Sequence, residues 1–408
     1  MIENLIVQKY GGTSVGSVEK IQAIAKKVEI LKSKNPLLKI VIVVSAMGKT
    51  TDALVKLAKE CSSDPDPREY DALVSTGENV SAALLSICLI EKKIPSISLS
   101  GSQAGILTEK HHSKAKVINV NPTRIKDALN KNQVVIVTGF QGINSVNDIT
   151  TIGRGGSDTS AVILASALGC STCEIYTDVD GIYTTDPRVV KEAKKLKEIS
   201  YEEMLELASL GATVLHPRAV ECAKINKTEL HVRSSFKSYP GTIVKEANNM
   251  ELQKAVTGIA VNKNEAIISI IGVTNKPGTA GIIFKEIAKN NINIDLIVQS
   301  IKYGNLNSIS FSIHEDDLLK TKSVCQNLVE TLGAKEIKTE ENIAKISIVG
   351  VGMISKPGIA AEMFDALGQE NINIKYISTS EIKISCVIEK HHADKAQAIL
   401  HSHFNLNS

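Results

Sequence analysis

The sequence predicts an α/β protein with a mostly parallel central sheet covered by helices on both faces, followed by two βαββ-type domains with a ferredoxin-like arrangement. Three observations predict this. The chain has 408 residues, which is too long for one hydrophobic core. Strand and helix patterns alternate over residues 1–247, and the last third contains an internal repeat of about 80 residues.

The alternating part begins with a short strand that ends in a Gly-rich turn. Residues 40–45 form a continuous β-rich apolar run, which is typical of a strand buried on both faces. Strands that alternate with helices favour a doubly wound parallel sheet. A polar stretch at 245–253 marks the expected end of this domain. The expected strands are 5–9, 40–45, 134–138 and 174–177, and the expected helices are 18–32, 70–90 and 159–168.

The repeat predicts two small domains, 262–338 and 339–408. Each copy has the pattern strand, Pro-Gly, helix, strand, strand, and a Pro-Gly pair is a good start for a helix. A unit of this kind cannot cover its own sheet, so we expect the copies to pack side by side or across a subunit boundary. The sequence leaves open whether strand 255–261 belongs to the second copy, with the first copy inserted inside it. The matching segments are 268–273 with 346–351, 277–284 with 357–364, and 291–294 with 371–374.

Composition excludes several classes of function. The net charge is +3, aromatic residues are 3% and Trp is absent, so nucleic-acid binding is not expected. Apolar runs such as 82–90 fall short of the roughly 18 residues that a membrane span needs, and no signal peptide pattern is present, so we expect a cytoplasmic protein. Cys170 and Cys173 have no second pair to complete a zinc site, so no protein metal site is expected. The pairs His111–His112 and His391–His392 lie in polar stretches and should face solvent.

The turn Lys9-Tyr-Gly-Gly-Thr-Ser14 follows the first strand. Two glycines allow a phosphate to approach the backbone, and Lys9 can neutralise charge on a transferring phosphoryl group. The alternative is an ordinary tight turn. Gly48-Lys-Thr50 is not a phosphate-binding P-loop, because Val43 stands where that motif needs a glycine.

A second Gly-rich segment, Gly153-Arg-Gly-Gly-Ser-Asp158, opens a helix. Arg154 offers a guanidinium fork for a carboxylate, and Asp158 can hold an ammonium group or orient Lys9. The alternative is a capped helix with a solvated Arg. Glu78 begins another helix and could receive a substrate ammonium, or it could simply be an acid favoured by the helix dipole.

A third segment, 177–188, follows a buried strand, and the carboxyl ends of parallel strands are where open α/β sheets bind ligands. Asp178, Tyr183 and Arg188 could therefore serve a nucleotide or metal. Its Asp-x-Asp-Gly run begins like a calcium loop, but Val189 occupies the position of the final Glu, so calcium is discounted.

Together, these segments resemble the aspartate kinases of the amino-acid-kinase fold, in order and in spacing. The resemblance extends to 211–217 and to the repeat, which is similar to a pair of ACT domains, so it covers essentially the whole chain. It implies transfer of the γ-phosphate of ATP, with Mg²⁺, to the β-carboxylate of L-aspartate. It also implies that this reaction, which forms 4-phospho-L-aspartate, is the first step toward lysine (through diaminopimelate), threonine and methionine.

The resemblance also implies residue roles. Lys9 and Asp158 would be catalytic. The aspartate-binding residues would be Ser45, Thr51, Glu78, Arg154 and Ser157, and the nucleotide-binding residues Lys9, Gly11, Gly12, Ser14, Thr177, Asp178, Tyr183 and Arg188. Lysine, threonine or both would bind the ACT domains near Asn275, Pro277, Gly278, Thr279, Ala280, Asn293 and Gln299.

Further implications concern assembly. A homo-oligomer, dimer or tetramer, would form through the ACT domains, and Met250 resembles the start of a separate regulatory subunit that some relatives make. Two positions depart from the family: Thr213 replaces a common Lys and Asn275 a common Asp. The alternatives are a sister kinase acting on glutamate, a catalytically inactive amino-acid sensor, and a kinase fused to homoserine dehydrogenase. We expect no dehydrogenase here, because the sequence stops just after the second repeat.

Overall fold

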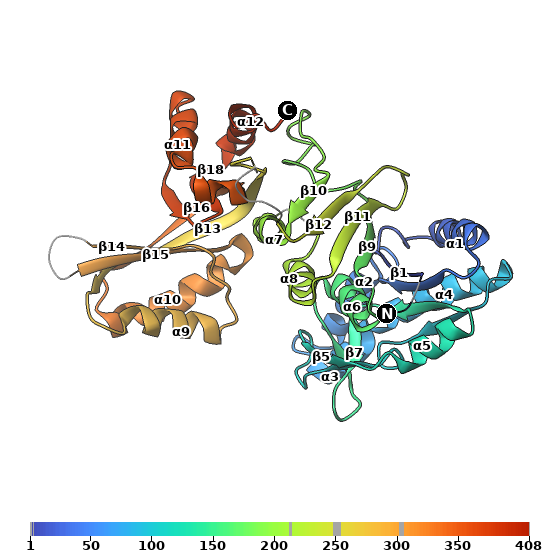
Figure 1. Cartoon of the computed structure of the whole chain (residues 1–408). Coiled ribbons are helices and arrows are strands. Elements are labelled where there is room, and N and C mark those ends of the chain that lie inside the picture. Colours follow the sequence, from blue (N-terminus) through green and yellow to red (C-terminus); the bar gives the residue numbers. More distant parts are fainter. Residues whose placement is uncertain (1, 3, 212–213, 248–253, 302–305, 408) are drawn as a thin grey trace. The chain divides into compact units, whose positions relative to one another are not determined.

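The computed structural model describes residues 2, 4–211, 214–247, 254–301 and 306–407, which form two compact units (Figure 1). The first unit comprises residues 1–182, 195–209 and 213–248, and the second comprises 183–194, 210–212 and 249–408. Thr213 and Met250, singled out above, lie outside the described residues.

The first unit is built on a sheet with the strand order β10-β12-β11-β9-β1-β2-β6-β3. Every neighbouring pair except β11 and β12 is parallel, so the predicted mostly parallel sheet is confirmed. A small second sheet has the order β5-β4-β7-β8. The strands are β1 Leu5–Tyr10, β2 Lys39–Val44, β3 Ser96–Leu99, β4 Ile106–Thr108, β5 Val117–Val120, β6 Val134–Thr138, β7 Gln141–Ile143, β8 Ile149–Thr151, β9 Thr172–Thr177, β10 Glu198–Ser200, β11 Glu229–Ser234 and β12 Thr242–Lys245.

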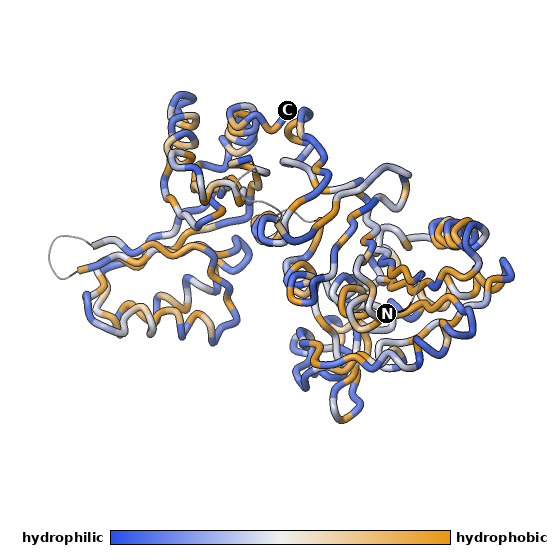
Figure 2. Tube along the Cα trace, viewed as in Figure 1, coloured by the Kyte–Doolittle hydropathy of each residue, from blue (hydrophilic) through white to orange (hydrophobic). Residues whose placement is uncertain are grey.

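Helices cover both faces of this sheet because its central strands are apolar on both sides. Ile40 and Ile42 of β2 pack with α1 and α4, whereas the equally buried Val41 and Val43 point the other way, where α6 contacts β1, β2 and β9. Figure 2 shows that apolar residues lie along the strands of this sheet. The helices are α1 Val18–Lys34, α2 Thr50–Cys61, α3 Pro67–Val74, α4 Thr76–Glu91, α5 Thr123–Asn130, α6 Gly156–Ala167, α7 Tyr201–Ser209 and α8 Pro217–Asn226.

The helix expected at 70–90 is in fact two helices, α3 and α4, that meet at Ser75. Taken together, Pro67–Glu91 is the one helical stretch among the described residues that is long and apolar enough to cross a membrane. This is longer than the apolar runs noticed in the sequence. Half of its most apolar part is buried in the first unit, and it carries the buried carboxylates Asp71 and Glu78. These features are typical of a core helix.

The second unit contains one antiparallel sheet to which both repeats contribute, with the order β14-β15-β13-β16-β18-β17. Its long strand β13 pairs with β16 from Gly258 opposite Val349 to Ile271 opposite Glu336. The two copies therefore pack side by side within the chain, which is one of the two arrangements expected from the sequence. The strands are β13 Gly258–Thr274, β14 Ile297–Ile301, β15 Leu306–His314, β16 Glu336–Val349, β17 Tyr376–Thr379 and β18 Lys383–Glu389.

Each repeat also has a second helix, which the strand-helix-strand-strand pattern lacked. The helices are α9 Thr279–Lys289 and α10 Leu318–Leu332 in the first copy, and α11 Ile359–Gln369 and α12 Ala393–His403 in the second. Each Pro-Gly pair does open a helix: Gly278 and Gly358 are the caps of α9 and α11, with φ of 92° and 99°. This left-handed conformation favours glycine. Val256 and Ile259 pack in the core formed by 346–406, so strand 255–261 contributes to the second copy's core.

Candidate active site

The polar segments predicted to bind substrates gather at the carboxyl edge of the first unit's parallel sheet. Segment 11–14 follows β1, 45–49 follows β2 and 178–180 follows β9, while 153–158 runs from just after β8 into the first turn of α6. Ligands bind at this edge in open α/β sheets because loops from several strands converge there.

Lys9 and Asp158 form an ion pair at the centre of this edge. Lys9 is near the end of β1 and Asp158 is in the first turn of α6, and Lys9 Nζ lies 2.6 Å from Asp158 Oδ1. Both side chains are about nine-tenths buried. The pair therefore holds one positive charge in a fixed position beside the Gly-rich turn, where a Cβ on Gly11 would lie 3.2 Å from Lys9 Nζ.

The turn after β1 packs closely against the turn after β2. The N–H of Gly48 donates to the carbonyl of Gly12 (3.0 Å), and a Cβ on Gly12 would lie 3.1 Å from Ala46 O. Ser14 differs from the expectation: its hydroxyl lies 2.5 Å from the hydroxyl of Ser235 and is buried. The Ser14 side chain therefore ties the turn to the end of β11 and is not exposed for a phosphate.

Glu78 is a buried carboxylate whose charge is only partly compensated. One oxygen accepts the N–H of Ala46 at 3.1 Å, and the other has no hydrogen-bond partner within the described structure. Burial raises the pKa of Glu78 to about 7. Gly77 allows the start of α4 to lie this close to Ala46, because a Cβ on Gly77 would lie 2.8 Å from the Cβ of Ala46. A buried, unpaired carboxylate at a site edge is suited to an ammonium group.

The segment 153–158 depends on a close contact with α8. Gly155 caps α6 with φ of 70°, and a Cβ on it would lie 2.2 Å from the Cβ of His216. His216 Nδ1 in turn accepts the N–H of Arg218, and burial lowers the pKa of the His216 ring. Arg154 is exposed beside this cap, whereas Ser157 is buried against Gly139.

The remaining predicted residues of the first unit lie around the same edge. Ser45 donates its N–H to the carbonyl of Tyr10 (3.1 Å), and Thr51 is half-buried in the first turn of α2. Thr177 ends β9 and its hydroxyl donates to Asp178 (3.2 Å).

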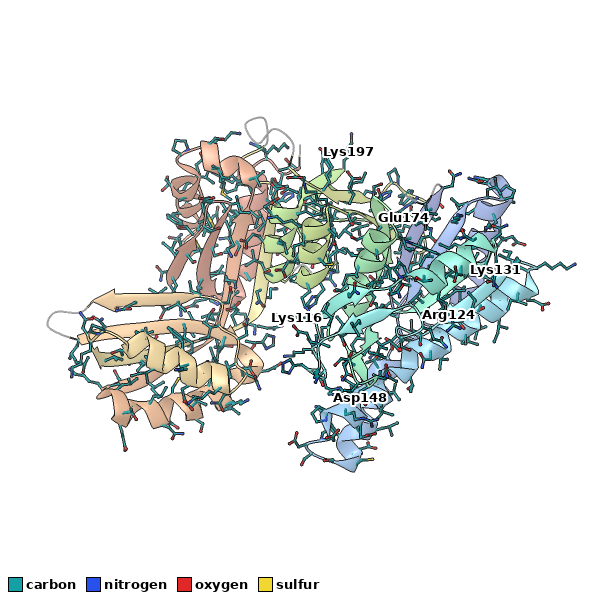
Figure 3. The ribbon with its side chains drawn as sticks, turned by 60° about the horizontal axis from the view of Figure 1, so that its bottom comes forward. Lys116, Arg124, Lys131, Asp148, Glu174 and Lys197 are labelled. Atoms are coloured by element: carbon teal, nitrogen blue, oxygen red, sulfur yellow. The ribbon has the colours of Figure 1, made fainter. Side chains whose placement is uncertain are left out.

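Below this edge, Glu174, labelled in Figure 3, ties three neighbouring strands together. It accepts hydrogen bonds from Gln8 on β1 (2.7 Å) and Arg233 on β11 (2.8 Å).

Tyr183 and Arg188 belong to the second unit, so the structure does not place them with the other predicted nucleotide-binding residues. Arg188 makes a two-pronged ion pair with Asp186. The neighbouring Thr184 and Thr185 are buried, and their hydroxyls contact His401 and Gln397 of α12 at 3.0 and 2.6 Å.

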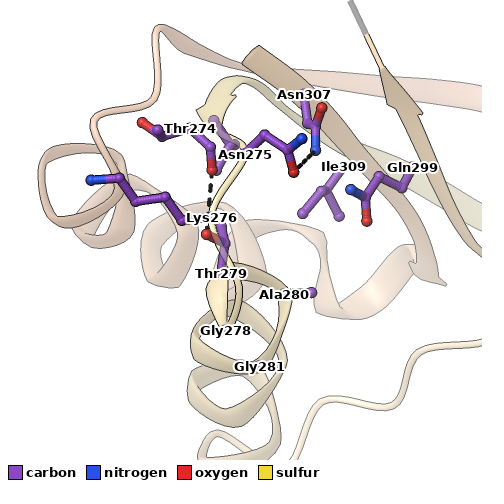
Figure 4. A pocket seen from close by; sticks show the side chains of 11 residues that line it. Thr274, Asn275, Lys276, Gly278, Thr279, Ala280, Gly281, Gln299, Asn307 and Ile309 are labelled. Carbon is purple, nitrogen blue, oxygen red and sulfur yellow. Dashed lines mark hydrogen bonds between the residues drawn. The ribbon is translucent and has the colours of Figure 1, made fainter. Parts of the chain in front are cut away.

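The second unit has a pocket at the start of α9, shown in Figure 4, with a volume of about 380 Å³ that includes open solvent. Five predicted effector residues line it, namely Asn275, Gly278, Thr279, Ala280 and Gln299. Pro277 and Asn293 are not among its lining residues. Asn307, which was not among the predicted residues, also lines it: its Nδ2 donates to Asn275 Oδ1 (3.0 Å), while its own Oδ1 is buried and has no hydrogen-bond partner among the described residues. No motif marks Asn307, because only the pairing of β13 with β15 brings it there.

The structure also locates the cysteines and the other residue types that commonly bind metal ions. Among the described residues, no group of three His, Cys, Asp or Glu side chains could hold a metal ion. All seven cysteines are free, and burial raises the pKa of Cys170 and Cys173, which disfavours the reactive thiolate.

Comparison with known proteins defines the class first. Residues 4–234 match the amino acid kinase family, and residues 268–328 and 346–404 match the ACT domain. The structure is similar to that of E. coli aspartokinase III in complex with aspartate and ADP (R-state), with a TM-score of 0.82 at 26% identity over 98% of this chain and 99% of that one. The same enzyme in complex with lysine and aspartate (T-state) gives 0.80 at 27% identity, over 98% and 100%. The protein is thus an amino acid kinase with ACT domains.

Relatives in sequence narrow the class. The chain is 50% identical to an aspartokinase of Geobacillus stearothermophilus over 98% of this chain and 97% of the relative. It is also 50% identical to aspartokinase 2 of Bacillus subtilis (strain 168), over 99% and 98%. The chain belongs to the aspartokinase family, the ATP-dependent aspartate kinases.

Proposed function

We propose that this chain transfers the γ-phosphate of ATP to the β-carboxylate of L-aspartate and forms 4-phospho-L-aspartate. The observation that carries the proposal is the buried Lys9–Asp158 pair, held 2.6 Å apart between a Gly-rich turn and the start of α6. Phosphoryl transfer needs positive charge fixed near the transferring group, and little covalent chemistry from the protein.

In this proposal Lys9 stabilises charge on the transferring phosphoryl group, and Asp158 holds Lys9 in position. Gly11 and Gly12 let the phosphates approach the backbone. Ser14 supports the turn through Ser235. The β-carboxylate is already ionised at neutral pH, so no general base is required. Precise placement of the two substrates then provides most of the rate enhancement.

The proposed aspartate site lies between α4 and the 153–158 segment. Arg154 binds the α-carboxylate, with Ser157 beside it, and the unpaired carboxylate of Glu78 binds the ammonium group. The two hydroxyls that follow β2, those of Ser45 and Thr51, complete the site.

The proposed nucleotide site includes Thr177 and Asp178, with Tyr183 and Arg188 retained from the family resemblance. Mg²⁺ would be held mainly by phosphate oxygens and water, a mode that needs only one or two protein carboxylates. Asp178, which follows β9 at the same edge of the sheet, is the carboxylate that would hold it, because Asp158 is paired with Lys9. When bound, Mg²⁺ neutralises phosphate charge.

A coupled ADP-release assay with MgATP tests the function directly. The acceptors are L-aspartate, L-glutamate, N-acetyl-L-glutamate and UMP. We expect turnover with L-aspartate alone. Turnover with another acceptor, or none with L-aspartate, would contradict the proposal.

We further propose that lysine, threonine or both bind the pocket at the start of α9 and inhibit the kinase. The free N–H groups at the start of α9 can hold the effector's carboxylate. None of the described residues that line the pocket is a carboxylate, so the effector's ammonium would contact neutral oxygens such as those of Gln299 and Asn307. If neither amino acid changes the rate or the KM for aspartate, this regulation is absent.

The remaining proposals concern the domain boundaries, the assembly and the pathway of the protein. We propose a catalytic domain at 1–247 and ACT domains at 262–338 and 339–408, with strand 255–261 in the second. The core that Val256 and Ile259 share with residues of the second ACT domain supports this last assignment. We also propose a cytoplasmic homo-oligomer acting at the first step toward lysine, threonine and methionine.

We further propose that a separate regulatory subunit starts at Met250. It would appear as a short band on a blot against the C-terminus and would be absent in a Met250→Leu strain.

A further inference from the structure

Asp71 is a fully buried carboxylate that the proposed chemistry does not use. It lies on α3, and its two oxygens accept hydrogen bonds from a loop and a strand far along the chain. The Thr151 hydroxyl donates at 2.6 Å and the Thr151 N–H at 2.9 Å, the Ser113 N–H donates at 2.9 Å, and His112 Nδ1 lies 3.0 Å away. His112 is therefore mostly buried, which corrects the expectation that it faces solvent.

These contacts hold backbone in a conformation that it would otherwise avoid. Ser113 has φ of 66°, a left-handed conformation that costs a non-glycine residue roughly 1 kcal/mol. Both oxygens of Asp71 accept its N–H. The loop is also fastened to β8, because the N–H of Ala115 donates to the carbonyl of Thr151 at 2.9 Å. Asp71 thus fixes Ser113 and Thr151 together.

The fixed segments adjoin the proposed aspartate site on both sides. Thr151 ends β8, and Arg154 follows three positions later. Between them, Gly153 packs closely against the fixed loop, because a Cβ on Gly153 would lie 3.1 Å from the carbonyl oxygen of Ser113. Asp71 itself precedes Glu78 by two turns, across the junction of α3 and α4.

A second contact reinforces the first. Gln141 pairs with Thr151 across the β7–β8 hairpin, and its buried Nε2 donates to the carbonyl of Ser75 at 2.8 Å. The hairpin that leads to Arg154 is thereby fastened at two points to the helices that carry Glu78.

We propose that Asp71, acting through Thr151, is a positioning residue that sets the separation of Arg154 and Glu78, and hence the fit of L-aspartate. This inference rests on the proposed function. An α-carboxylate and an ammonium on one carbon need their two partners at a fixed spacing, and small displacements of a positioned group are costly. Neither Asp71 nor Thr151 needs to touch substrate in this arrangement.

The sharpest test is Thr151→Val, which keeps the shape of the side chain and the backbone N–H but removes the hydroxyl that donates to Asp71. We expect the KM for L-aspartate to rise about tenfold while the KM for ATP changes less than about twofold, because Arg154 and Glu78 would no longer be held at the spacing that L-aspartate needs. Thr151→Ser restores the hydroxyl and should bring the KM for L-aspartate to within about twofold of the wild-type value.

Asp148→Asn is the matched control. Asp148, labelled in Figure 3, joins the same hairpin to α3 through an exposed ion pair with Arg68 (2.9 Å). Exposed pairs contribute little, so both KM values should stay unchanged. An unchanged KM for L-aspartate in Thr151→Val, or an equal rise for both substrates, would overturn the inference. Wild-type protein without activity on L-aspartate would instead overturn the proposed function, and this assignment with it.

Discussion

Replacement of Glu78 by Gln tests the electrostatic part of the site. The substitution keeps an oxygen that can accept the N–H of Ala46, but it removes the negative charge from a side chain that is 3% exposed. If Glu78 binds the ammonium group of L-aspartate, the variant loses a charge-assisted hydrogen bond worth roughly 1.5–3 kcal/mol. The KM for L-aspartate should therefore rise by about 10- to 150-fold, with little change in the KM for ATP.

The pH dependence of kcat/KM for L-aspartate gives a second test of Glu78. Burial raises the pKa of Glu78 to about 7, so about half of the free enzyme carries the binding-competent carboxylate at that pH, and about one part in eleven at pH 6. With wild-type protein, kcat/KM for L-aspartate should be about elevenfold below its plateau at pH 6. Glu78→Gln should lack this limb of the profile. Glu91→Gln, at the exposed end of the same helix, is the control and should keep it.

The same pKa affects folding, with a definite sign. In the unfolded chain Glu78 ionises near its ordinary value of 4.5, whereas the folded protein retains the proton to about 7. Its contribution to stability is therefore greatest below pH 4.5, declines as the pH rises toward 7, and stays low above it. The difference corresponds to roughly 3 kcal/mol.

Urea unfolding at pH 5 and pH 8 measures this effect on folding. Glu78→Gln should remove about 2–3 kcal/mol of the wild-type difference between the two pH values. An unchanged KM for L-aspartate together with an unchanged pH profile would refute the role of Glu78.

Three further predictions follow from the geometry. Lys9→Ala should lower kcat by more than about 100-fold with a smaller effect on ATP binding, measured by calorimetry; near-normal turnover would remove Lys9 from catalysis. Gly155→Ala should raise the KM for L-aspartate more than about tenfold and lower the unfolding free energy by at least about 1 kcal/mol, because a Cβ at φ of 70° meets His216. Gly368→Ala, which has open space around it, should do neither. Asn307→Leu should weaken inhibition by lysine or threonine at least about tenfold without changing uninhibited kinetics, and unchanged inhibition would exclude Asn307 from the effector site.

Much of the fold was predictable because its signals are local. The β-rich apolar run 40–45 is typical of a strand buried on both faces, and the structure has β2 at Lys39–Val44. The second helix of each repeat was missed although its signal is present: the buried Leu318, Thr321, Cys325, Leu328 and Leu332 recur at helical spacing along α10.

The errors at the site arise from contacts that no local pattern encodes. The Ser14 hydroxyl faces Ser235, which is distant in the sequence, so a Gly-rich turn alone could not reveal its direction. His112 was expected in solvent because its neighbours are polar, whereas Asp71 on α3 holds it. By contrast, the contact between Lys9 and Asp158 could be expected from the parallel topology. This topology brings the end of β1 and the start of α6 to the same edge of the sheet.

In the proposed reaction the β-carboxylate of L-aspartate receives the phosphoryl group. The most direct measurement incubates the protein with MgATP and L-aspartate in the presence of hydroxylamine, which converts an acyl phosphate into a hydroxamate, and identifies the product by mass spectrometry. We predict β-aspartyl hydroxamate in amounts that match the ADP released, and its loss in Lys9→Ala. Release of ADP without hydroxamate, or formation of the α-isomer, would contradict phosphoryl transfer to the β-carboxylate.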